Sequence, residues 1–431
     1  MKSQWQSVMK MTITEPVLAT NYDVAIIGSG PAGLATATAL KKLGVKNIVV
    51  LERSDEAGGN TRHCGHSPFG MREFKRVYLG PAYARKMVRE AELHGVNIAL
   101  NTSVISLGEA GLLTLSTPQG ITQLQAKKVV ISTGIREMPR APRFVSGQRP
   151  AGIMTAGALQ SMVYLSHKKP FYSPVIVGTE LVSFSAIATC RHVGIKPVAM
   201  LEENKRSTAY SALNLLPSVL GIKRLLNTQI VDITGKQQVS GVNVINSAGE
   251  TSHIACDGVI FTGRFTPEAS LARSANIEID PNTQGPVIDQ FGRCSDPAYF
   301  ASGNILRPVE TGGWCWAEGT QTAQFVKDSL ADKLPNTDKQ LKVNIISDKI
   351  KYVVPQRISY SNEQTLIMGM SHFQLRVKTA VKSGKVTMTS NNKEVNSKNL
   401  KALPERRVLI PIPSFSQQQI DDNYPLVVDY V

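Results

Sequence analysis

The sequence predicts an α/β fold in which two similar strand–turn–helix–strand units, one inserted into the other, precede a small β-rich domain. A glycine-rich turn at residues 28–33 follows an apolar strand, and the same pattern starts again at residue 178 with equal spacing. The chain has 431 residues, too many for one hydrophobic core. Its 42% hydrophobic and 19% charged residues exclude a largely disordered or fibrous protein.

The first unit reads as strand, glycine turn, helix, strand and acid. Residues 23–27 are a short apolar strand, residues 34–43 have helical composition, and residues 47–51 form a second strand closed by Glu52. This order is typical of a dinucleotide-binding turn, in which the helix N-terminus favours phosphate and the acid accepts from a ribose hydroxyl.

Each glycine of this turn has its own predicted role. Gly28 permits the tight turn, Gly30 lets a pyrophosphate approach the backbone, and Gly33 lets the helix pack closely on the strand. The other cofactor contacts expected around this turn are Pro31, Ala32, Arg53 and Gly59.

The second unit repeats the first, with strands at 174–177 and 197–201 and a helix at 181–193. Gly178 and Glu202 are 24 residues apart, as are the corresponding glycine and acid of the first unit. This equal spacing predicts that the chain contains two related nucleotide-binding units.

The second turn departs from the first where a phosphate would bind. Glu180 stands in the place of Gly30, and Ser183 in the place of Gly33. A carboxylate repels a pyrophosphate, so two interpretations stay open. Either a nicotinamide dinucleotide binds, with Glu202 favouring NAD over NADP, or the unit is a retained structural domain without a ligand.

The two units, taken in this order, resemble the flavoproteins with two dinucleotide-binding domains, which are the pyridine nucleotide–disulfide oxidoreductase-like group. The resemblance covers roughly residues 20–335. The resemblance implies two Rossmann-like domains. The FAD-binding domain would comprise 20–138 and 264–335, with an NAD(P)-binding-like domain inserted at 139–263. A small β-rich domain would follow at 336–431.

The resemblance also implies where FAD is held. Beyond the first turn, the implied FAD contacts are Val104, Thr133, Gly134, Gly303, Asn304, Gly312 and Gly313. Asn304 replaces the usual acid, but it can still hydrogen-bond a ribityl hydroxyl. A helix expected at 314–330 would direct its positive end at the flavin and stabilise the reduced anion. In the second unit, Gly178 and Glu202 are the implied contacts.

The redox disulfide that names the group is absent. The stretch 60–66 contains His63, Cys64 and His66 beside Arg62, without a second cysteine in reach. A neighbouring positive charge could lower the pKa of Cys64, and either histidine could donate a proton. The alternative is a loop that packs under the flavin. No metal site is predicted, because a fourth ligand is missing.

Three further stretches, 63–72, 134–139 and 150–160, look like a subgroup that includes the FAD-carrying subunits of opine oxidase and hydrogen cyanide synthase. Oxidoreductases that accompany glycerol-3-phosphate-type dehydrogenases also belong to it. Opine-oxidase-type subunits usually end in a cysteine-rich iron–sulfur segment. Residues 336–431 contain no cysteine, so that relay is not expected.

The net charge of +15 comes from the segments 62–89, 136–149 and 336–431. An anionic cofactor, substrate or partner surface suits this distribution better than nucleic acid, for which no motif is present. The cysteines are scattered, the first 20 residues lack the apolar core of a secretory signal, and no run of 18 apolar residues exists. A cytoplasmic location is expected, and peripheral membrane contact stays open.

The last segment has strand composition in several places. The strands are expected at 352–354, 373–377, 385–389 and 407–412, with turns at 383–384 and 391–392. In the wider family this position holds a dimer interface, so a homo-oligomer stays open by analogy only.

The sequence therefore predicts an FAD-dependent oxidoreductase that moves a hydride or electron pair through the flavin. In one hypothesis NAD(P)H reduces the flavin, which passes electrons to an unidentified acceptor, and a small-molecule substrate is an expected partner. In the other, the chain is an electron-transfer or scaffolding subunit of a dehydrogenase, without NAD(P)H activity of its own. The substrate and the acceptor do not follow from the sequence.

Overall fold

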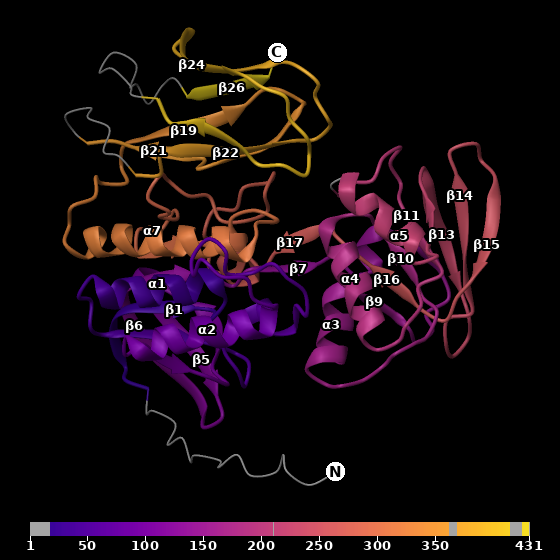
Figure 1. The fold of residues 1–431 in the computed structure, drawn as a ribbon. Coiled ribbons are helices and arrows are strands. Elements are labelled where there is room, and N and C mark those ends of the chain that lie inside the picture. The colour runs from indigo at the N-terminus through magenta and orange to yellow at the C-terminus, as the bar shows by residue number, and fades with distance from the viewer. Residues whose placement is uncertain (1–17, 210, 362–368, 414–424, 431) are drawn as a thin grey trace.

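The structure is a computed structural model that describes residues 18–209, 211–361, 369–413 and 425–430. Figure 1 shows three bodies: a first α/β unit at lower left, an inserted unit at right, and a β-rich C-terminal domain above the first unit. The expectation for the N-terminus falls mostly outside the described residues. Within those residues, no helix combines the length and the apolarity that a membrane span needs.

The first unit is built on a mostly parallel sheet, in which β2 and the C-terminal ends of β1 and β6 are apolar. The strands follow the order β3-β2-β1-β6-β5-β4, and β18 pairs with β6. They are β1 (Asn21–Ile27), β2 (Ile48–Leu51), β3 (Asn97–Ala99), β4 (Ser103–Leu107), β5 (Leu112–Thr117), β6 (Gly120–Ile131) and β18 (Tyr299–Ala301). Every residue of β2 is buried, as expected of a parallel strand that is covered on both faces.

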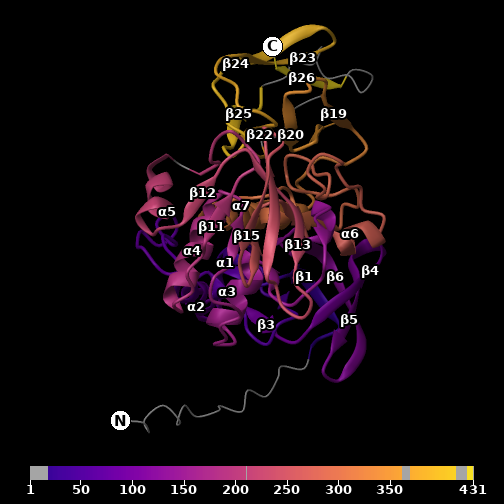
Figure 2. The same ribbon diagram turned by 90° about the vertical axis from the view of Figure 1, so that its right-hand side faces the viewer.

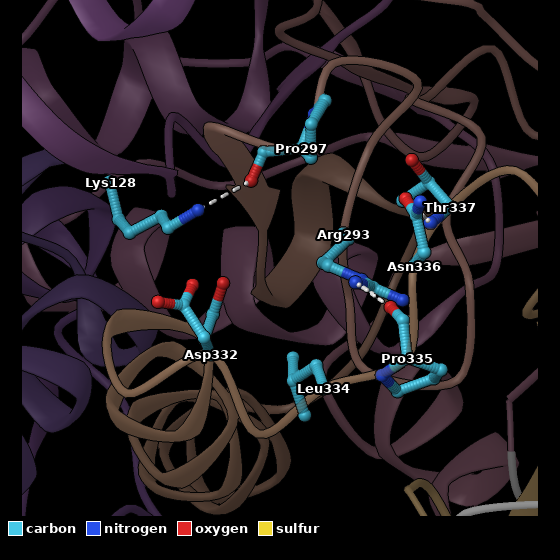
Figure 3. A pocket seen from close by; sticks show the side chains of 9 residues that line it. Lys128, Arg293, Pro297, Asp332, Leu334, Pro335, Asn336 and Thr337 are labelled. Atoms are coloured by element: carbon cyan, nitrogen blue, oxygen red, sulfur yellow. Dashed lines mark hydrogen bonds between the residues drawn. The ribbon is translucent and has the colours of Figure 1, made fainter. Parts of the chain in front are cut away.

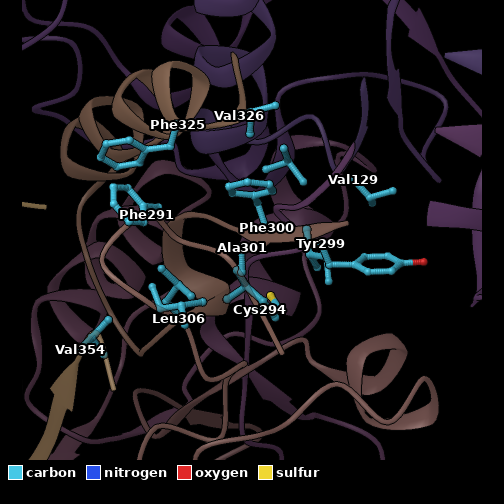
Figure 4. Packing of buried hydrophobic residues seen from close by; sticks show 14 of the residues in the cluster. Val129, Phe291, Cys294, Tyr299, Phe300, Ala301, Leu306, Phe325, Val326 and Val354 are labelled. Carbon is cyan, nitrogen blue, oxygen red and sulfur yellow. The ribbon is translucent and has the colours of Figure 1, made fainter. Parts of the chain in front are cut away.

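Helices from distant parts of the chain cover this sheet. They are α1 (Pro31–Lys42), α2 (Gly80–Leu93), α6 (Ser270–Ser274) and α7 (Gly312–Leu330). In Figure 1, α1 and α7 run side by side. Figure 4 shows Phe325 of α7 near Phe291 and Phe300, and the rings of Phe291 and Phe325 are 5.6 Å apart. Val354 of the C-terminal domain belongs to the same cluster, so the two bodies share a core.

The inserted unit repeats the strand–helix–strand pattern, as predicted. Its parallel sheet has the order β12-β11-β10-β16-β9, and a second sheet has the order β15-β14-β13-β8. The strands are β8 (Ser146–Gly147), β9 (Ile153–Thr155), β10 (Val175–Val177), β11 (Ala199–Leu201), β12 (Lys223–Leu225), β13 (Thr228–Thr234), β14 (Gly241–Asn246), β15 (Thr251–Ala255) and β16 (Val259–Phe261). The helices are α3 (Ala156–Tyr164), α4 (Leu181–His192) and α5 (Leu215–Val219).

Two short strands connect the units. β7 (Ile135–Glu137) and β17 (Phe265–Pro267) pair antiparallel where the chain enters and leaves the inserted unit. The predicted fold class, with one α/β unit inserted into another and a β-rich C-terminal region, is confirmed. The residue boundaries assigned to the domains stay a prediction.

The C-terminal domain has two small sheets, of order β21-β19-β26-β23-β24 and β20-β22-β25. Its strands are β19 (Gln340–Ile345), β20 (Ile350–Val354), β21 (Arg357–Ser359), β22 (His372–Val377), β23 (Lys385–Ser390), β24 (Lys393–Asn399), β25 (Val408–Pro411) and β26 (Leu426–Tyr430). All four predicted strands are present, and Asn391 and Asn392 form the predicted turn with φ of 48° and 57°. Figure 2, in which the inserted unit faces the viewer, shows this domain at the top of the molecule.

Two cationic side chains hydrogen-bond backbone carbonyl oxygens near the junction between α7 and the C-terminal domain (Figure 3). Arg293 Nη1 donates to the carbonyl oxygen of Pro335 at 2.7 Å, and Lys128 Nζ donates to that of Pro297 at 3.2 Å. A cavity of about 230 Å³ lies among these residues. The donors are therefore committed to holding the junction.

Candidate functional site

The first glycine turn has the backbone that its sequence predicts. Gly28 has φ +103°, and a Cβ there would lie 2.6 Å from the Ser132 carbonyl oxygen. A Cβ on Gly33 would collide with the Gly28 carbonyl oxygen. A Cβ added at Gly30 would have no atom within 4 Å. A Cβ added at Gly59 would lie only 2.8 Å from the Gly30 Cα. Two glycines close the turn, and the backbone at Gly30 stays accessible.

The helix behind this turn is suited to an anion. Helix α1 starts at Pro31 without a side-chain cap and has no acidic residue in its first turn. Its first N–H groups and its positive dipole end are therefore available to a phosphate. Ala32 packs under Gly303, where a built Cβ would lie 2.7 Å from the Ala32 Cβ. The residues present fit the pyrophosphate of FAD.

The acid of the first unit lies at the same edge of the sheet. Glu52 is buried, and its Oε2 accepts from the Ser29 backbone N at 3.0 Å and from the Ser29 hydroxyl at 2.6 Å. Its Oε1 accepts from the Ser54 backbone N at 2.9 Å. The carboxylate is held firmly, and Oε1 has a lone pair left for a ribose hydroxyl.

Two predicted cofactor residues lie on either side of this acid. Val104 is half-buried on β4, two residues after Thr102, whose backbone N donates to the Glu52 carbonyl oxygen at 2.9 Å. Arg53 follows the acid directly and is exposed. Of the two, Val104 has the semi-apolar setting that an adenine ring prefers.

The small-residue turn after β6 passes close to the glycine turn. The Thr133 hydroxyl donates to the Glu268 carbonyl oxygen at 2.8 Å, and the Glu268 backbone N donates to the Gly134 carbonyl oxygen at 2.9 Å. These bonds tie the turn to the chain that returns from the inserted unit.

The late motif is held by a buried ion pair. The Gly303 backbone N donates to Glu318 Oε2 at 2.9 Å, and Glu318 pairs with Arg307 at 3.0 Å. The Asn304 amide bonds both backbone groups of Glu310, at 3.0 and 2.7 Å. The donor and acceptor capacity left on this amide is what a ribityl hydroxyl could use.

The start of α7 lies under aromatic side chains. A Cβ on Gly312 would lie 3.4 Å from the Tyr83 ring and 3.5 Å from the Phe69 ring, and one on Gly313 would lie 3.0 Å from Glu73. The expected helix at 314–330 is confirmed and extended by two residues.

Cations of the C-terminal domain also reach this helix end. Trp314 lies between two guanidinium groups, with Arg72 3.7 Å and Arg407 3.8 Å from its ring centroid. Glu310 pairs with Arg376 at 3.2 Å and with Arg407 at 3.8 Å. The domain thus neutralises an acid whose negative charge would offset the positive potential at the N-terminus of α7.

The side chain of Glu180 fills the space above the second glycine turn. Glu180 caps α4, and its Oε2 accepts from the Thr262 hydroxyl at 3.0 Å and from the Ser183 hydroxyl at 3.2 Å. Its carboxylate lies so close to Gly178 and Gly263 that a Cβ on either would collide with it. Burial raises the pKa of Glu180. The space above this turn therefore holds a carboxyl group.

The acid of the second unit nevertheless keeps the arrangement of the first. Glu202 is buried and accepts from the Thr179 hydroxyl and from the backbone N of Asn204 at 3.0 Å. Arg206, which follows it, makes a double hydrogen bond to Glu405 of the C-terminal domain at 3.0 and 2.9 Å.

The histidine–cysteine loop forms the 3₁₀ helix η1 (Gly59–His63) and is largely enclosed. Burial raises the pKa of Cys64 to about 12, with a smaller contribution from the charge of Glu137. Burial lowers the pKa of His63 to about 4, and burial also lowers that of His66. Of the two alternatives left open by the sequence, this setting favours the packed loop, because burial raises the pKa of Cys64 in spite of the neighbouring positive charge. Over the described ranges, no three His, Cys, Asp or Glu side chains gather as metal ligands would.

Sequence reasoning did not single out Glu137 and Arg143, which both lie between the two units. Arg143 Nη2 donates to the carbonyl oxygens of Thr262 and Gly263 at 2.9 and 2.8 Å. No local residue pattern indicates these hydrogen bonds, because the fold brings the partners together from distant positions in the chain.

Comparisons with known proteins agree with this arrangement. Residues 22–325 match the family described as pyridine nucleotide-disulphide oxidoreductase. The fold is similar to thioredoxin reductases from T. acidophilum (TM-score 0.59, 21% identity, 72% of this chain and 100% of that one) and Lactococcus lactis (TM-score 0.60, 20% identity, 72% and 99%).

Some curated relatives are named as a subunit or a component of a larger system. An opine oxidase subunit from Agrobacterium tumefaciens is 27% identical, over 68% of this chain and 64% of the relative. The ferredoxin reductase component of a Cupriavidus chlorobenzene dioxygenase is 27% identical, over 67% of this chain and 68% of the relative. The chain spans less than two thirds of the length of the opine oxidase subunits.

The family match covers well over half of the chain, and the fold has the two nucleotide-binding units of that class. The chain belongs to the pyridine nucleotide-disulphide oxidoreductase family. Its two Rossmann-like units give it the fold of that family.

Proposed function

We propose that this protein moves an electron pair through FAD in the first unit and takes that pair from a substrate or a partner protein. The observation that carries the proposal is the Glu180 carboxyl group, which fills the space above the second glycine turn. A pyrophosphate at that place would meet a carboxylate instead of open backbone, and both bulk and charge oppose it.

FAD supplies the two-electron acceptor when it is bound. The first-turn N–H groups of α1 would hold its pyrophosphate, and Glu52 would orient its adenosine ribose. The positive end of α7 would stabilise negative charge on the reduced ring. Phe69 and Tyr83 cover that helix end and would keep water from it.

The names of the relatives support a partner. The opine oxidase subunit from Agrobacterium and the dioxygenase ferredoxin reductase component are each parts of larger systems. Five unpaired cysteines fit the reducing cytoplasm, where we place the reaction.

A second candidate, in which NAD(P)H reduces the flavin, is favoured by one observation. Glu202 keeps the hydrogen-bonding arrangement of Glu52, which a ribose would use. One relative is named as a ferredoxin–NAD(+) reductase subunit. Glu202 can orient a ribose only if the attached pyrophosphate also fits, so Glu180 decides between the candidates.

The test is anaerobic reduction of the purified yellow protein. We expect no bleaching of the flavin by NADH or NADPH, while photoreduction bleaches it fully. Rapid bleaching by either nucleotide would overturn the proposed electron source. A colourless protein that cannot be reconstituted with FAD would overturn the flavin role itself.

A further inference from the structure

A cavity of about 190 Å³ lies between helix α7 and the C-terminal domain. Figure 1 shows that domain above α7. One wall comes from α7, with Trp314, Ala317 and Glu318, and the other from strands β22 and β25, with Gln374 and Leu409. Among the described residues that line the cavity, none is an FAD contact expected from the sequence. The cavity is therefore a feature apart from the predicted nucleotide contacts.

Arg407 brings open hydrogen-bond donors to this cavity, which it lines. Its side chain is 10% exposed, and its guanidinium group lies 3.8 Å from the centroid of the Trp314 ring. Nη1 donates to Gln374 Oε1 at 3.1 Å, while Nε and Nη2 make no hydrogen bond to the part of the chain that the structure describes. Neither of these two atoms is fully enclosed. The Nε–Nη2 edge of a guanidinium group binds a carboxylate through two parallel hydrogen bonds.

The arginines around this edge outnumber the acids. Glu310 meets two guanidinium groups, those of Arg376 at 3.2 Å and Arg407 at 3.8 Å. Glu318 is paired with Arg307 at 3.0 Å. These side chains are at most 12% exposed, so salt and water screen their charges little. This group of three arginines and two glutamates, which we call the arginine cluster, has one positive charge more than its carboxylates balance.

The same groups determine the electrostatic environment of Arg407. Burial lowers the pKa of Arg407, the charges of Glu310 and Glu318 raise it, and those of Arg307 and Arg376 lower it. An arginine keeps its charge at neutral pH in spite of such effects. The enclosed charge of Arg407 is therefore only partly offset, and a bound anion would offset the rest.

The size and the walls of the cavity indicate which anion fits. An apolar protein cavity of about 150 Å³ holds a molecule such as benzene, and this cavity is larger. Beside Arg407, its walls include the apolar side chains of Trp314, Met370 and Leu409. One excess positive charge matches a monoanion better than a phosphate dianion. A carboxylate on a small apolar body combines these properties.

We propose that this cavity is a binding site for a small organic monocarboxylate. The carboxylate accepts from Nε and Nη2 of Arg407, and the apolar body packs against Trp314, Met370 and Leu409. The bound ligand balances the excess charge of the arginine cluster and touches both α7 and the C-terminal domain, so it stabilises their contact. The inference goes beyond the proposed function, because no step of it involves the flavin.

Calorimetric titration of the purified full-length protein tests the site. The probes are benzoate and acetate, with benzamide as the neutral counterpart of benzoate and inorganic phosphate as the other anion. We expect benzoate to bind one-to-one and at least about tenfold more tightly than benzamide or phosphate, because only a carboxylate on a small body uses both the Arg407 edge and the apolar walls. Acetate should bind more weakly than benzoate, since it buries less apolar surface.

Three variants locate the binding. Arg407→Gln should weaken benzoate binding by about tenfold or more, since it removes the bidentate edge and the excess charge. Arg406→Gln removes the same charge at the exposed neighbouring position and is the matched control, with native affinity. Ala317→Leu keeps every charge and fills the cavity from α7, so it should also prevent binding.

Thermal unfolding provides a second measurement and shows whether each variant folds. Benzoate should raise the unfolding midpoint of the native protein and of Arg406→Gln, because a ligand that binds only the folded state stabilises it. The midpoints of Arg407→Gln and Ala317→Leu should stay unchanged on addition of benzoate.

The outcomes also separate this inference from the proposed function. Absence of benzoate and acetate binding by the native protein, or undiminished binding by a folded Arg407→Gln or Ala317→Leu protein, would overturn the inference. Phosphate binding as tight as that of benzoate would overturn the carboxylate class. A colourless native protein that binds benzoate would support the site while the flavin role fails, and a yellow protein without benzoate binding would do the reverse.

Discussion

The two nucleotide-binding units have the same backbone at the glycine turn and differ in one decisive side chain. Gly30 and Glu180 each cap the following helix, both with φ of −73° and extended ψ. A side chain at Gly30 would point into open space, whereas the Glu180 carboxyl group turns back over Gly178 and Gly263. Binding capacity at this turn is thus set by a residue that the fold itself does not require.

In contrast to the turn residues, the acids Glu52 and Glu202 are arranged alike in the two units. Glu52 and Glu202 are both buried, and both accept from the residue after the first glycine of their turn. This bond closes the turn onto the next strand, so it stabilises the unit with or without a ligand. The acid is retained for the fold, and its presence in the second unit is therefore weak evidence for a bound dinucleotide.

We expect the largest effect on cofactor binding when the glutamate of the second turn is introduced at the equivalent position of the first turn. Gly30→Glu should weaken FAD binding by more than about a hundredfold, or roughly 3 kcal/mol, because a carboxylate would face the pyrophosphate. The unit should still fold, since nothing lies within 4 Å of the added Cβ. Flavin absorbance of the purified protein and FAD titration measure the loss.

The uncharged variant Gly30→Gln separates charge from bulk. It should bind FAD more tightly than Gly30→Glu and more weakly than the native protein. If Gly30→Glu retained full flavin content, the interpretation of both turns would be wrong.

The reverse exchange should open the second unit. Glu180→Gly is expected to raise the affinity for NADH by about tenfold or more, since it removes the carboxyl group and restores accessible backbone. Calorimetric titration measures the change, and Glu180→Gln, which keeps the bulk, is the control. Equal NADH binding by the native protein and Glu180→Gly would show that the carboxyl group does not close the site.

The pH dependence of stability provides a further contrast. Burial raises the folded-state pKa of Glu180, so its contribution to stability is complete below the unfolded pKa and is lost as pH rises through the raised value. The midpoint of thermal unfolding of the native protein should fall, relative to that of Glu180→Gln, as pH rises from 4 to 8. Parallel curves for the two proteins would contradict the raised pKa.

The sequence predicted those parts of the site that backbone geometry dictates. Gly28 needs a positive φ, and Gly33 meets the Gly28 carbonyl oxygen, so only glycine serves at either position. Because of such constraints, particular residue types stand at a fixed spacing in the sequence. The same spacing also indicated the repeat.

The rest of the site depends on contacts that no local pattern contains. The Glu180 carboxyl group is bonded by Thr262, 82 positions along the chain. Glu137 accepts from the backbone N of Gly157, 20 positions along the chain, and only the fold brings the two together. The sequence left two interpretations of Cys64 open, because it shows the charged neighbours of this residue but not the burial that raises its pKa.

The smallest effect concerns the contact between the inserted unit and the C-terminal domain. Arg206 and Glu405 form a double hydrogen bond, but their side chains are 44% and 26% exposed. Water and salt screen such a pair, so Glu405→Gln should cost only about 0.2–1 kcal/mol of unfolding free energy. The same variant frees Arg206, which follows the ribose acid. In a Glu180→Gly background it should therefore raise the affinity for NADPH more than that for NADH. Equal gains for both nucleotides would show that Arg206 does not reach a 2′-phosphate.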